Sequence, residues 1–170
     1  YNNNEGSVYE FWDQVTPTDP RRVGNPIFLR RDYKRRCIPF EIHGDGVPVT
    51  KKLKFDVSSM KSVLCKLMDW IWFIGGLFEE CKVKQDDNFP ESTYDKFWRV
   101  LTWSFLALEE GKWPMVDWDG RAFTADDGID FEMRGKQLAG GWYGHIWLGK
   151  ADNEHICNVR KCQGIGVHIM

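Results

Sequence analysis

The clearest periodic signal in the chain lies between residues 92 and 110. Ser92, with Asp95 three residues later, resembles a capping box, and Gly111 stands where a helix would end. The pattern predicts a helix over 92–110 whose aromatic side chains belong to the core. The apolar residues that fall on one face of this helix are Tyr94, Phe97, Trp98, Leu101, Phe105 and Leu108.

Before this helix the pattern is typical of extended segments. Residues 37–43 predict a first strand, in which Pro39 lacks an amide donor and indicates an edge position or an irregular start. Residues 47–57 predict a second strand, and residues 60–74 a third extended region. Within that region the apolar run 67–74 is too continuous to assign from its period, so a strand and a buried helix are both open.

The rest of the chain alternates helical, loop-like and extended patterns. Residues 8–12 place aromatic side chains on a short helical face, and residues 111–128 are acidic and rich in turn signals. A short helix is expected over 129–138. Polar and apolar residues alternate over 142–150 and predict a fourth strand, after which a helix could begin at residue 153. Strands mixed with helices indicate an α/β fold.

Composition indicates one ordinary domain. The chain has 170 residues, of which 42% are hydrophobic and 15% aromatic, with nine tryptophans, which is ample for a core. No apolar run reaches the length of a membrane span. Five cysteines at irregular spacing predict reduced thiols, as in an intracellular protein. The chain begins at Tyr1 without an initiator methionine, so we expect a fragment or a processed product.

The net charge of −2 argues against a generic polyanion binder, but the charge is uneven. Basic residues dominate positions 21–54, and acidic residues dominate positions 85–130. Such a chain could present a polarised surface suited to a phosphate backbone. The alternative is an ordinary solvated face.

Candidate chemistry centres on Asp45, which follows the first predicted strand between Gly44 and Gly46. An acid on such unhindered backbone can meet a metal or a phosphate, although Asp-Gly is also a favoured hairpin turn. His43 could contact a phosphate or orient the acid, or it could simply be packed or solvated. Asp152 follows the fourth predicted strand, where it could also cap the next helix. If the first and fourth strands are neighbours, Asp45 and Asp152 emerge together and could hold one or two divalent cations.

Several segments in order along the chain resemble the many-copy, transposon-derived proteins of dinoflagellate genomes. The most specific is His43-Gly44-Asp45-Gly46-Val47-Pro48. The supporting segments are Glu10-Phe11-Trp12, Asn25-Pro26-Ile27, Ile38-Pro39, Trp103-Ser104-Phe105, Trp113-Pro114, Asp117-Trp118, Leu138-Ala139-Gly140-Gly141 and Lys150-Ala151-Asp152.

This resemblance implies a layout similar to transposases with a ribonuclease-H-like core, in which three acids bind two divalent metals. Asp45 would be the first acid and Asp152 the second, with Mg²⁺ or Mn²⁺ as cofactor. The expected organisation is an N-terminal arm over 1–36, with a short helix and a basic segment, and a ribonuclease-H-like α/β domain with a mixed sheet over 37–170. The family continues into a cysteine pair and a third acid, which this chain lacks, so a domain truncated at its C-terminus or an inactive descendant is expected.

The resemblance implies a nuclear, DNA-binding protein that would cut or join DNA strands if its site is intact. The residues expected on the nucleic acid are His43 and the cations of the basic segment: Arg30, Arg31, Lys34, Arg35 and Arg36. The alternative is a non-catalytic structural or assembly subunit on the same fold, which would bind other protein chains or a missing C-terminal segment. A small-molecule enzyme has no motif to support it.

Overall fold

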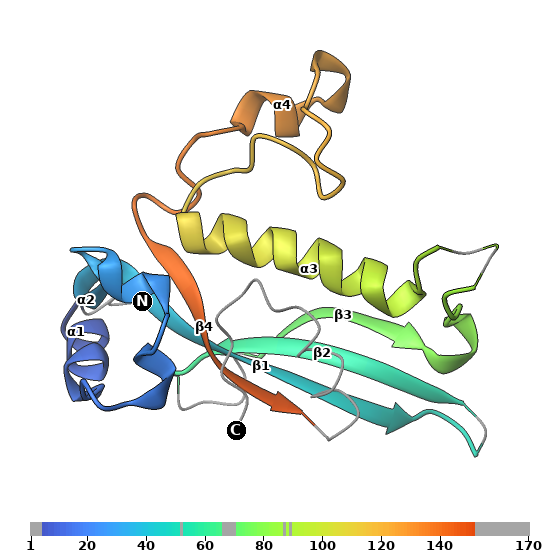
Figure 1. Ribbon diagram of the computed structural model, residues 1–170, viewed down its shortest axis with the longest axis horizontal. Coiled ribbons are helices and arrows are strands. Elements are labelled where there is room, and N and C mark those ends of the chain that lie inside the picture. Colours follow the sequence, from blue (N-terminus) through green and yellow to red (C-terminus); the bar gives the residue numbers. More distant parts are fainter. Residues whose placement is uncertain (1–4, 52, 66–70, 87, 89, 152–170) are drawn as a thin grey trace.

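The computed structural model describes residues 5–151 except residues 52, 66–70, 87 and 89 (Figure 1). Four strands form one mixed sheet in the order β3-β2-β1-β4. Neighbours β1–β2 and β2–β3 are antiparallel, whereas β4 runs parallel to β1. The α/β prediction is confirmed, and the first and fourth strands are neighbours. The strand bounds are β1 Cys37–Pro48, β2 Lys54–Ser62, β3 Trp72–Phe78 and β4 Tyr143–Ala151.

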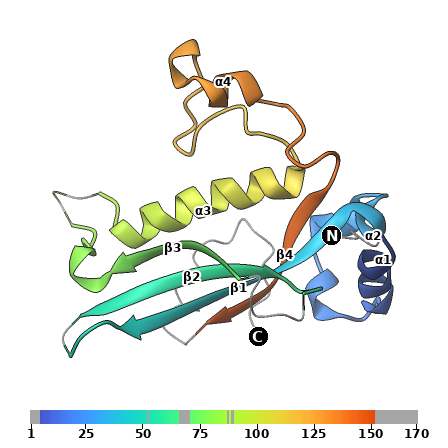
Figure 2. The same ribbon diagram turned by 180° about the vertical axis from the view of Figure 1, so that it is seen from behind.

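Helix α3 lies along one face of the sheet in both views, and the shorter α1 and α2 lie at the end where β1 begins (Figures 1 and 2). Among the described helices, none combines the length and apolar character needed to span a bilayer. The α-helices are α1 Glu5–Gln14, α2 Tyr33–Arg36, α3 Thr93–Glu110 and α4 Ile129–Met133, and short 3₁₀ turns occur at Pro20–Arg22, Pro26–Leu29, Glu79–Cys81 and Ala125–Asp127.

The predicted long helix is confirmed as α3. The Ser92 side chain accepts a hydrogen bond from the Asp95 amide, and Gly111 ends the helix with a left-handed φ of 73°. Its buried face packs on strands β1 and β4, and Gly144 of β4 makes this close packing possible. A Cβ at that position would lie 2.4 Å from the Phe40 ring and 2.9 Å from Leu108. The buried members of this core are Phe40, Ile42, Trp98, Leu101, Phe105 and Ile146.

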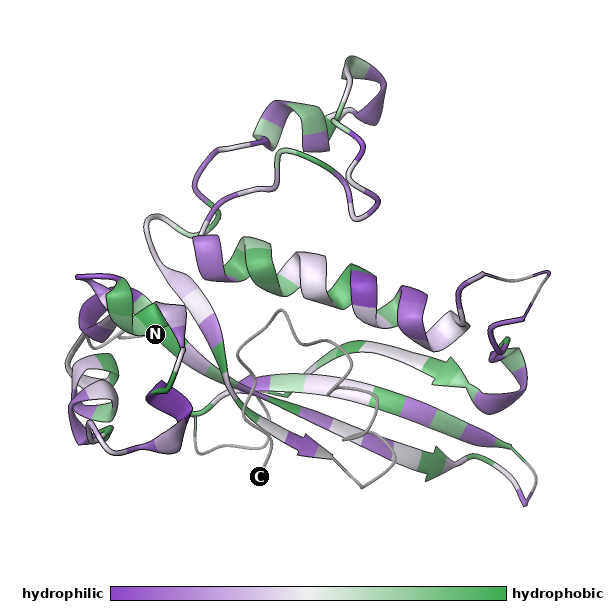
Figure 3. Ribbon diagram, in the orientation of Figure 1, coloured by the Kyte–Doolittle hydropathy of each residue, from purple (hydrophilic) through white to green (hydrophobic). Residues whose placement is uncertain are grey.

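The strand boundaries differ from those predicted. Val47 and Pro48 belong to β1, and the chain reverses direction between Pro48 and Lys54, where β2 begins. The Val49 amide donates to the Leu53 carbonyl at 2.8 Å. Figure 3 shows hydrophilic and hydrophobic residues alternating along β2 of this hairpin. The segment 67–74 ends in a strand, β3, that begins at Trp72, and α4 is shorter than the helix expected over 129–138.

A second core joins the N-terminal segment to the sheet, so the expected arm shares its packing with β1 and β4. Trp12 of α1 is fully buried, and its indole N–H donates to the Cys37 carbonyl at 2.7 Å. Burial raises the pKa of the Cys37 thiol well above its ordinary value. The described cysteines, Cys37, Cys65 and Cys81, are free thiols, as predicted. The buried residues of this core are Val8, Trp12, Ile27, Cys37, Tyr143 and Trp147.

Three buried or half-buried polar side chains hold the N-terminal segment, β4 and α3 together. Asn25 accepts from the Ile27 amide through Oδ1 at 3.0 Å, so its Nδ2 faces Nε2 of His145 at 2.9 Å. His145 therefore accepts at Nε2 and donates from Nδ1 to the Glu109 carboxylate at 3.1 Å. His145 is only 1% exposed, and this chain of hydrogen bonds satisfies both of its ring nitrogens.

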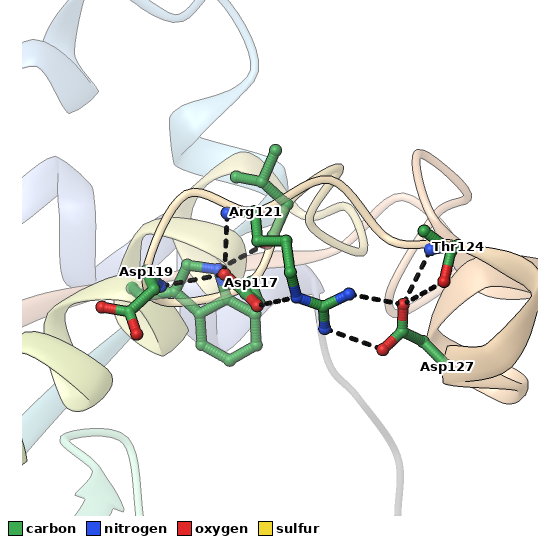
Figure 4. Close-up of polar contacts among 7 residues, drawn as sticks. Asp117, Asp119, Arg121, Thr124 and Asp127 are labelled. Atoms are coloured by element: carbon green, nitrogen blue, oxygen red, sulfur yellow. Dashed lines mark hydrogen bonds and ion pairs between the residues drawn. The ribbon is translucent and has the colours of Figure 1, made fainter.

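Between α3 and β4 the chain makes an excursion, residues 112–142, that projects from α3 (Figures 1 and 2). Paired backbone bonds between Trp113 and residues 135 and 136 close its base, each at 2.9 Å. Arg121 then bridges Asp117 at 2.9 Å and Asp127 at 2.7 Å (Figure 4). These bonds from Arg121 hold the pKa of Asp127 well below its usual range. Two acids of the excursion, Asp117 and Asp127, are therefore paired within it.

Candidate functional site

Strand β1 carries a row of polar side chains on the face opposite the α3 core. Side chains alternate across a strand, so Glu41, His43 and Asp45 share one face, whereas Phe40 and Ile42 point into the core under α3. The register of β1 with β2 is continuous from Phe40 to Pro48, which preserves this alternation. His43 and Asp45 are exposed, and we name the side carrying Glu41, His43 and Asp45 the polar face.

Glu41 is the most buried of the three side chains on the polar face. It is only 8% exposed and lies between two ammonium groups, Lys61 of β2 and Lys150 of β4, each 3.1 Å from a carboxylate oxygen. Burial by itself favours the neutral acid, but the hydrogen bonds from Lys150 and Lys61 outweigh it and lower the pKa of Glu41. The carboxylate is therefore ionised, and both lysines are held in place over the sheet.

A pocket of about 280 Å³ opens beside this triad. Glu41, Lys61 and Lys150 supply its charged wall, and His43 supplies part of its rim towards Asp45. Sequence reasoning missed Glu41, Lys61 and Lys150, which come from three different strands. The available signal was the alternation of Glu41 with His43 and Asp45, which places all three on one face of a strand.

Asp45 lies inside β1, opposite Val57, and not at a strand end or in the hairpin turn. The expected position at the end of the strand was wrong, because the ladder to β2 continues to Pro48. The Asp45 carboxylate is exposed and forms no hydrogen bond or ion pair with the residues that the structure describes. The space over the next residue, Gly46, is occupied by the Lys54 side chain, whose Cε lies 2.0 Å from where a Cβ would be. A larger residue at position 46 would therefore have to displace the flexible end of the Lys54 side chain.

Asp152 lies outside the described residues. The register of β4 nevertheless extends to Ala151, the residue before it, and Ala151 pairs with Gly44, the residue before Asp45. Within the described part of the chain, no three His, Cys, Asp or Glu side chains are grouped as metal ligands would be.

The basic segment lies at the other end of β1. Arg30 stacks over the Tyr143 ring at 3.4 Å and donates to the Glu109 carbonyl at 2.8 Å. Lys34 pairs with Asp13 at 2.7 Å, and Arg36 lies over the Trp142 ring at 5.4 Å. These three cations contribute to packing between elements.

Arg31 and Arg35 differ from the other cations of the basic segment. Both are exposed, and their side chains form no ion pair or hydrogen bond with described residues. Arg35 lies in α2, before β1 begins, and the part of β1 from Cys37 to Asp45 extends for about 26 Å. The structure thus brings His43 and Asp45 together and separates them from the basic segment.

Comparison of the chain with known protein families, with curated proteins and with solved structures finds no match.

Proposed function

We propose that this chain is a ribonuclease-H-like domain of a transposase-like protein, which binds DNA and performs metal-dependent phosphoryl transfer, as strand cleavage or joining. The observation that carries the proposal is the pairing of Gly44 with Ala151 in parallel strands. Asp45 and Asp152 follow this pair directly in the amino-acid sequence. The order of three antiparallel strands, a helix and a fourth strand beside the first also agrees with such a core.

The donor set fits a divalent cation in part. Asp45 offers an exposed carboxylate without a partner among the described residues. Carboxylate oxygens are the ligands that Mg²⁺ and Mn²⁺ prefer. Asp45 and Asp152 would hold the ion, which would supply charge stabilisation for the attacking and leaving oxygens of a phosphodiester.

The chain's own residues would position the nucleic acid. His43 lies beside Asp45 on the polar face and would contact a phosphate oxygen. Arg31 and Arg35 are exposed cations available to the backbone of a longer DNA segment, where such contacts set position and not sequence. Such a protein would act in the nucleus.

A second candidate is a non-catalytic assembly subunit on the same fold. It is favoured by apolar side chains on the edge strand β3 and by the finding that the described residues include no group of three metal-ligating side chains. Trp72 is 46% exposed and Phe73 is 63% exposed, which suits contact with another protein chain.

Metal-dependent cleavage of labelled DNA tests the proposal. With Mg²⁺ or Mn²⁺, the parent chain should nick DNA, and Asp45→Asn should lower the rate at least ~100-fold, because a catalytic metal contributes several kcal/mol. The matched control is Asp126→Asn, which removes an exposed acid of the excursion and should leave the rate unchanged. If the parent neither binds these ions nor cuts DNA, the catalytic function is excluded and the assembly function is favoured.

A further inference from the structure

The pocket on the polar face has a charge excess that the proposed metal site does not use. Glu41 contributes one negative charge, whereas Lys61 and Lys150 contribute two positive charges. The lowered pKa of Glu41 keeps its charge in place at neutral pH. A net positive charge therefore remains at the mouth of a concave site, where it attracts anions.

The two ammonium groups also have donors to spare. Each ammonium carries three N–H groups. Lys61 lies 3.1 Å from Oε1 of Glu41, and Lys150 lies 3.1 Å from Oε2. The Lys61 side chain is 24% exposed and the Lys150 side chain 53% exposed, so both remain within reach of a ligand. Glu41 acts as a positioning residue, because it holds two flexible side chains on either side of β1.

The remaining walls limit the size and chemistry of a ligand. Ile71 adds an apolar side chain to the lining of the pocket, and His43 and Ser59 add polar atoms. A volume of about 280 Å³ is at the small end for ligand sites and suits a phosphate with an attached sugar, not a large molecule.

We propose that this pocket binds a phosphate group between Lys61 and Lys150. The inference builds on the proposed function, because the phosphate would belong to the nucleic-acid strand presented to Asp45. Glu41 and Asp45 are four residues apart on one face of β1, or about 13 Å. That distance corresponds to roughly four nucleotides of a helical strand, so one strand could occupy both positions. A free nucleotide offers the same phosphate chemistry.

The test measures binding without metal, in EDTA, by anisotropy of a labelled single-stranded oligonucleotide, with a nucleoside monophosphate as competitor. We expect Lys150→Gln to weaken binding roughly tenfold, because it removes a charged donor, and the double variant with Lys61→Gln to weaken it further. The logarithmic slope of affinity against salt should become shallower by about 0.7 for each phosphate that the variant no longer neutralises.

Two controls keep the result interpretable. Lys136→Gln removes an exposed lysine of the excursion and should not change affinity. The double variant Lys61→Arg with Lys150→Arg keeps both charges and should retain binding, which separates loss of phosphate binding from loss of folding. Equal affinity for the parent and the double glutamine variant would overturn the inference.

The outcomes also separate this inference from the proposed function. Lysine-dependent binding of the oligonucleotide alone assigns the phosphate to nucleic acid, and lysine-dependent competition by the monophosphate assigns it to a small ligand. If binding depends on the lysines but the protein does not cut DNA, phosphate binding by the pocket is supported and the proposed nuclease function is excluded. If DNA is cut and bound equally well by the variants of both lysines, the nuclease function is supported and phosphate binding by the pocket is excluded.

Discussion

At its start, strand β1 is enclosed by the N-terminal segment, whereas from Glu41 onward its odd-numbered side chains reach an open face. Just before the strand begins, the cations Arg30, Lys34 and Arg36 stack on aromatic rings or pair with acids of neighbouring elements. In the second half His43 and Asp45 are exposed and have no such partners among the described residues.

This difference separates charges that hold the fold together from charges available to a ligand. A cation stacked on a buried ring contributes to stability, and its removal should loosen the packing. An exposed carboxylate on a paired strand contributes little to stability, and its removal should change only the affinity for a ligand. Three cations of the basic segment, Arg30, Lys34 and Arg36, therefore take part in packing, and further candidates for ligand binding lie on β1, which follows that segment.

The largest effect is expected in the enclosed half. Trp12→Ala removes a fully buried ring and leaves the Cys37 carbonyl without its donor, so the free energy of unfolding should fall by about 3–5 kcal/mol. Urea denaturation measures this loss. Trp72→Ala, at a half-exposed tryptophan of β3, is the matched control and should cost much less. Equal losses would mean that the two regions do not differ.

Asn25→Ala should cause the next largest loss in the free energy of unfolding. It removes the partner of His145 Nε2 and of the Ile27 amide in a buried site, which costs about 1–3 kcal/mol. Thermal unfolding reports this change, and Asn88→Ala at an exposed position provides the control. A variant as stable as the parent would show that the bridge between the N-terminal segment and β4 is unimportant.

Within the basic segment, Arg30 and Arg35 should behave differently. Arg30→Gln removes the stack on Tyr143 and the bond to the Glu109 carbonyl and should destabilise by about 1 kcal/mol. Arg35→Gln should change stability by less than about 0.5 kcal/mol, since its side chain is exposed. A reversed order would assign Arg35 to the fold.

The smallest effect is the acid dependence contributed by Glu41. Its pKa is lowered in the folded state, so its stabilising contribution is present above the ordinary glutamate pKa and is lost as the pH falls through the lowered value. Glu41→Gln should make the decline in stability between pH 6 and pH 3 shallower than in the parent. Parallel pH curves for the two proteins would contradict the ion pairing with Lys61 and Lys150.

Sequence reasoning succeeded where the determinants are local. The period of α3, the Ser92 cap and the Gly111 terminus act within a few residues, so the helix could be predicted. Asp45-Gly46 also carried a local turn signal, but pairing with β2 overrode it, so that the strands stay paired as far as Pro48 and Lys54. Turn preference is weak when a longer strand ladder can form.

The candidate site was harder to predict from the sequence, because its determinants are far apart along the chain. The ion pairs of Glu41 with Lys61 and Lys150 join three strands, and only the order β2, β1, β4 in the sheet brings these residues together. Asp45 could be identified from its flanking glycines, because unhindered backbone is a local property. The structural use of Arg30 depends on Tyr143, more than a hundred residues away, and could not be predicted.

The central claim is that the polar face of β1 binds a divalent cation at Asp45. Paramagnetic broadening by Mn²⁺ in an amide-resolved NMR spectrum tests it most directly. We predict that substoichiometric Mn²⁺ first broadens the amides of Gly44, Asp45 and Gly46, and that this selectivity disappears in Asp45→Asn. Broadening centred on the acidic excursion around Asp126, or a pattern unchanged in Asp45→Asn, would contradict the account.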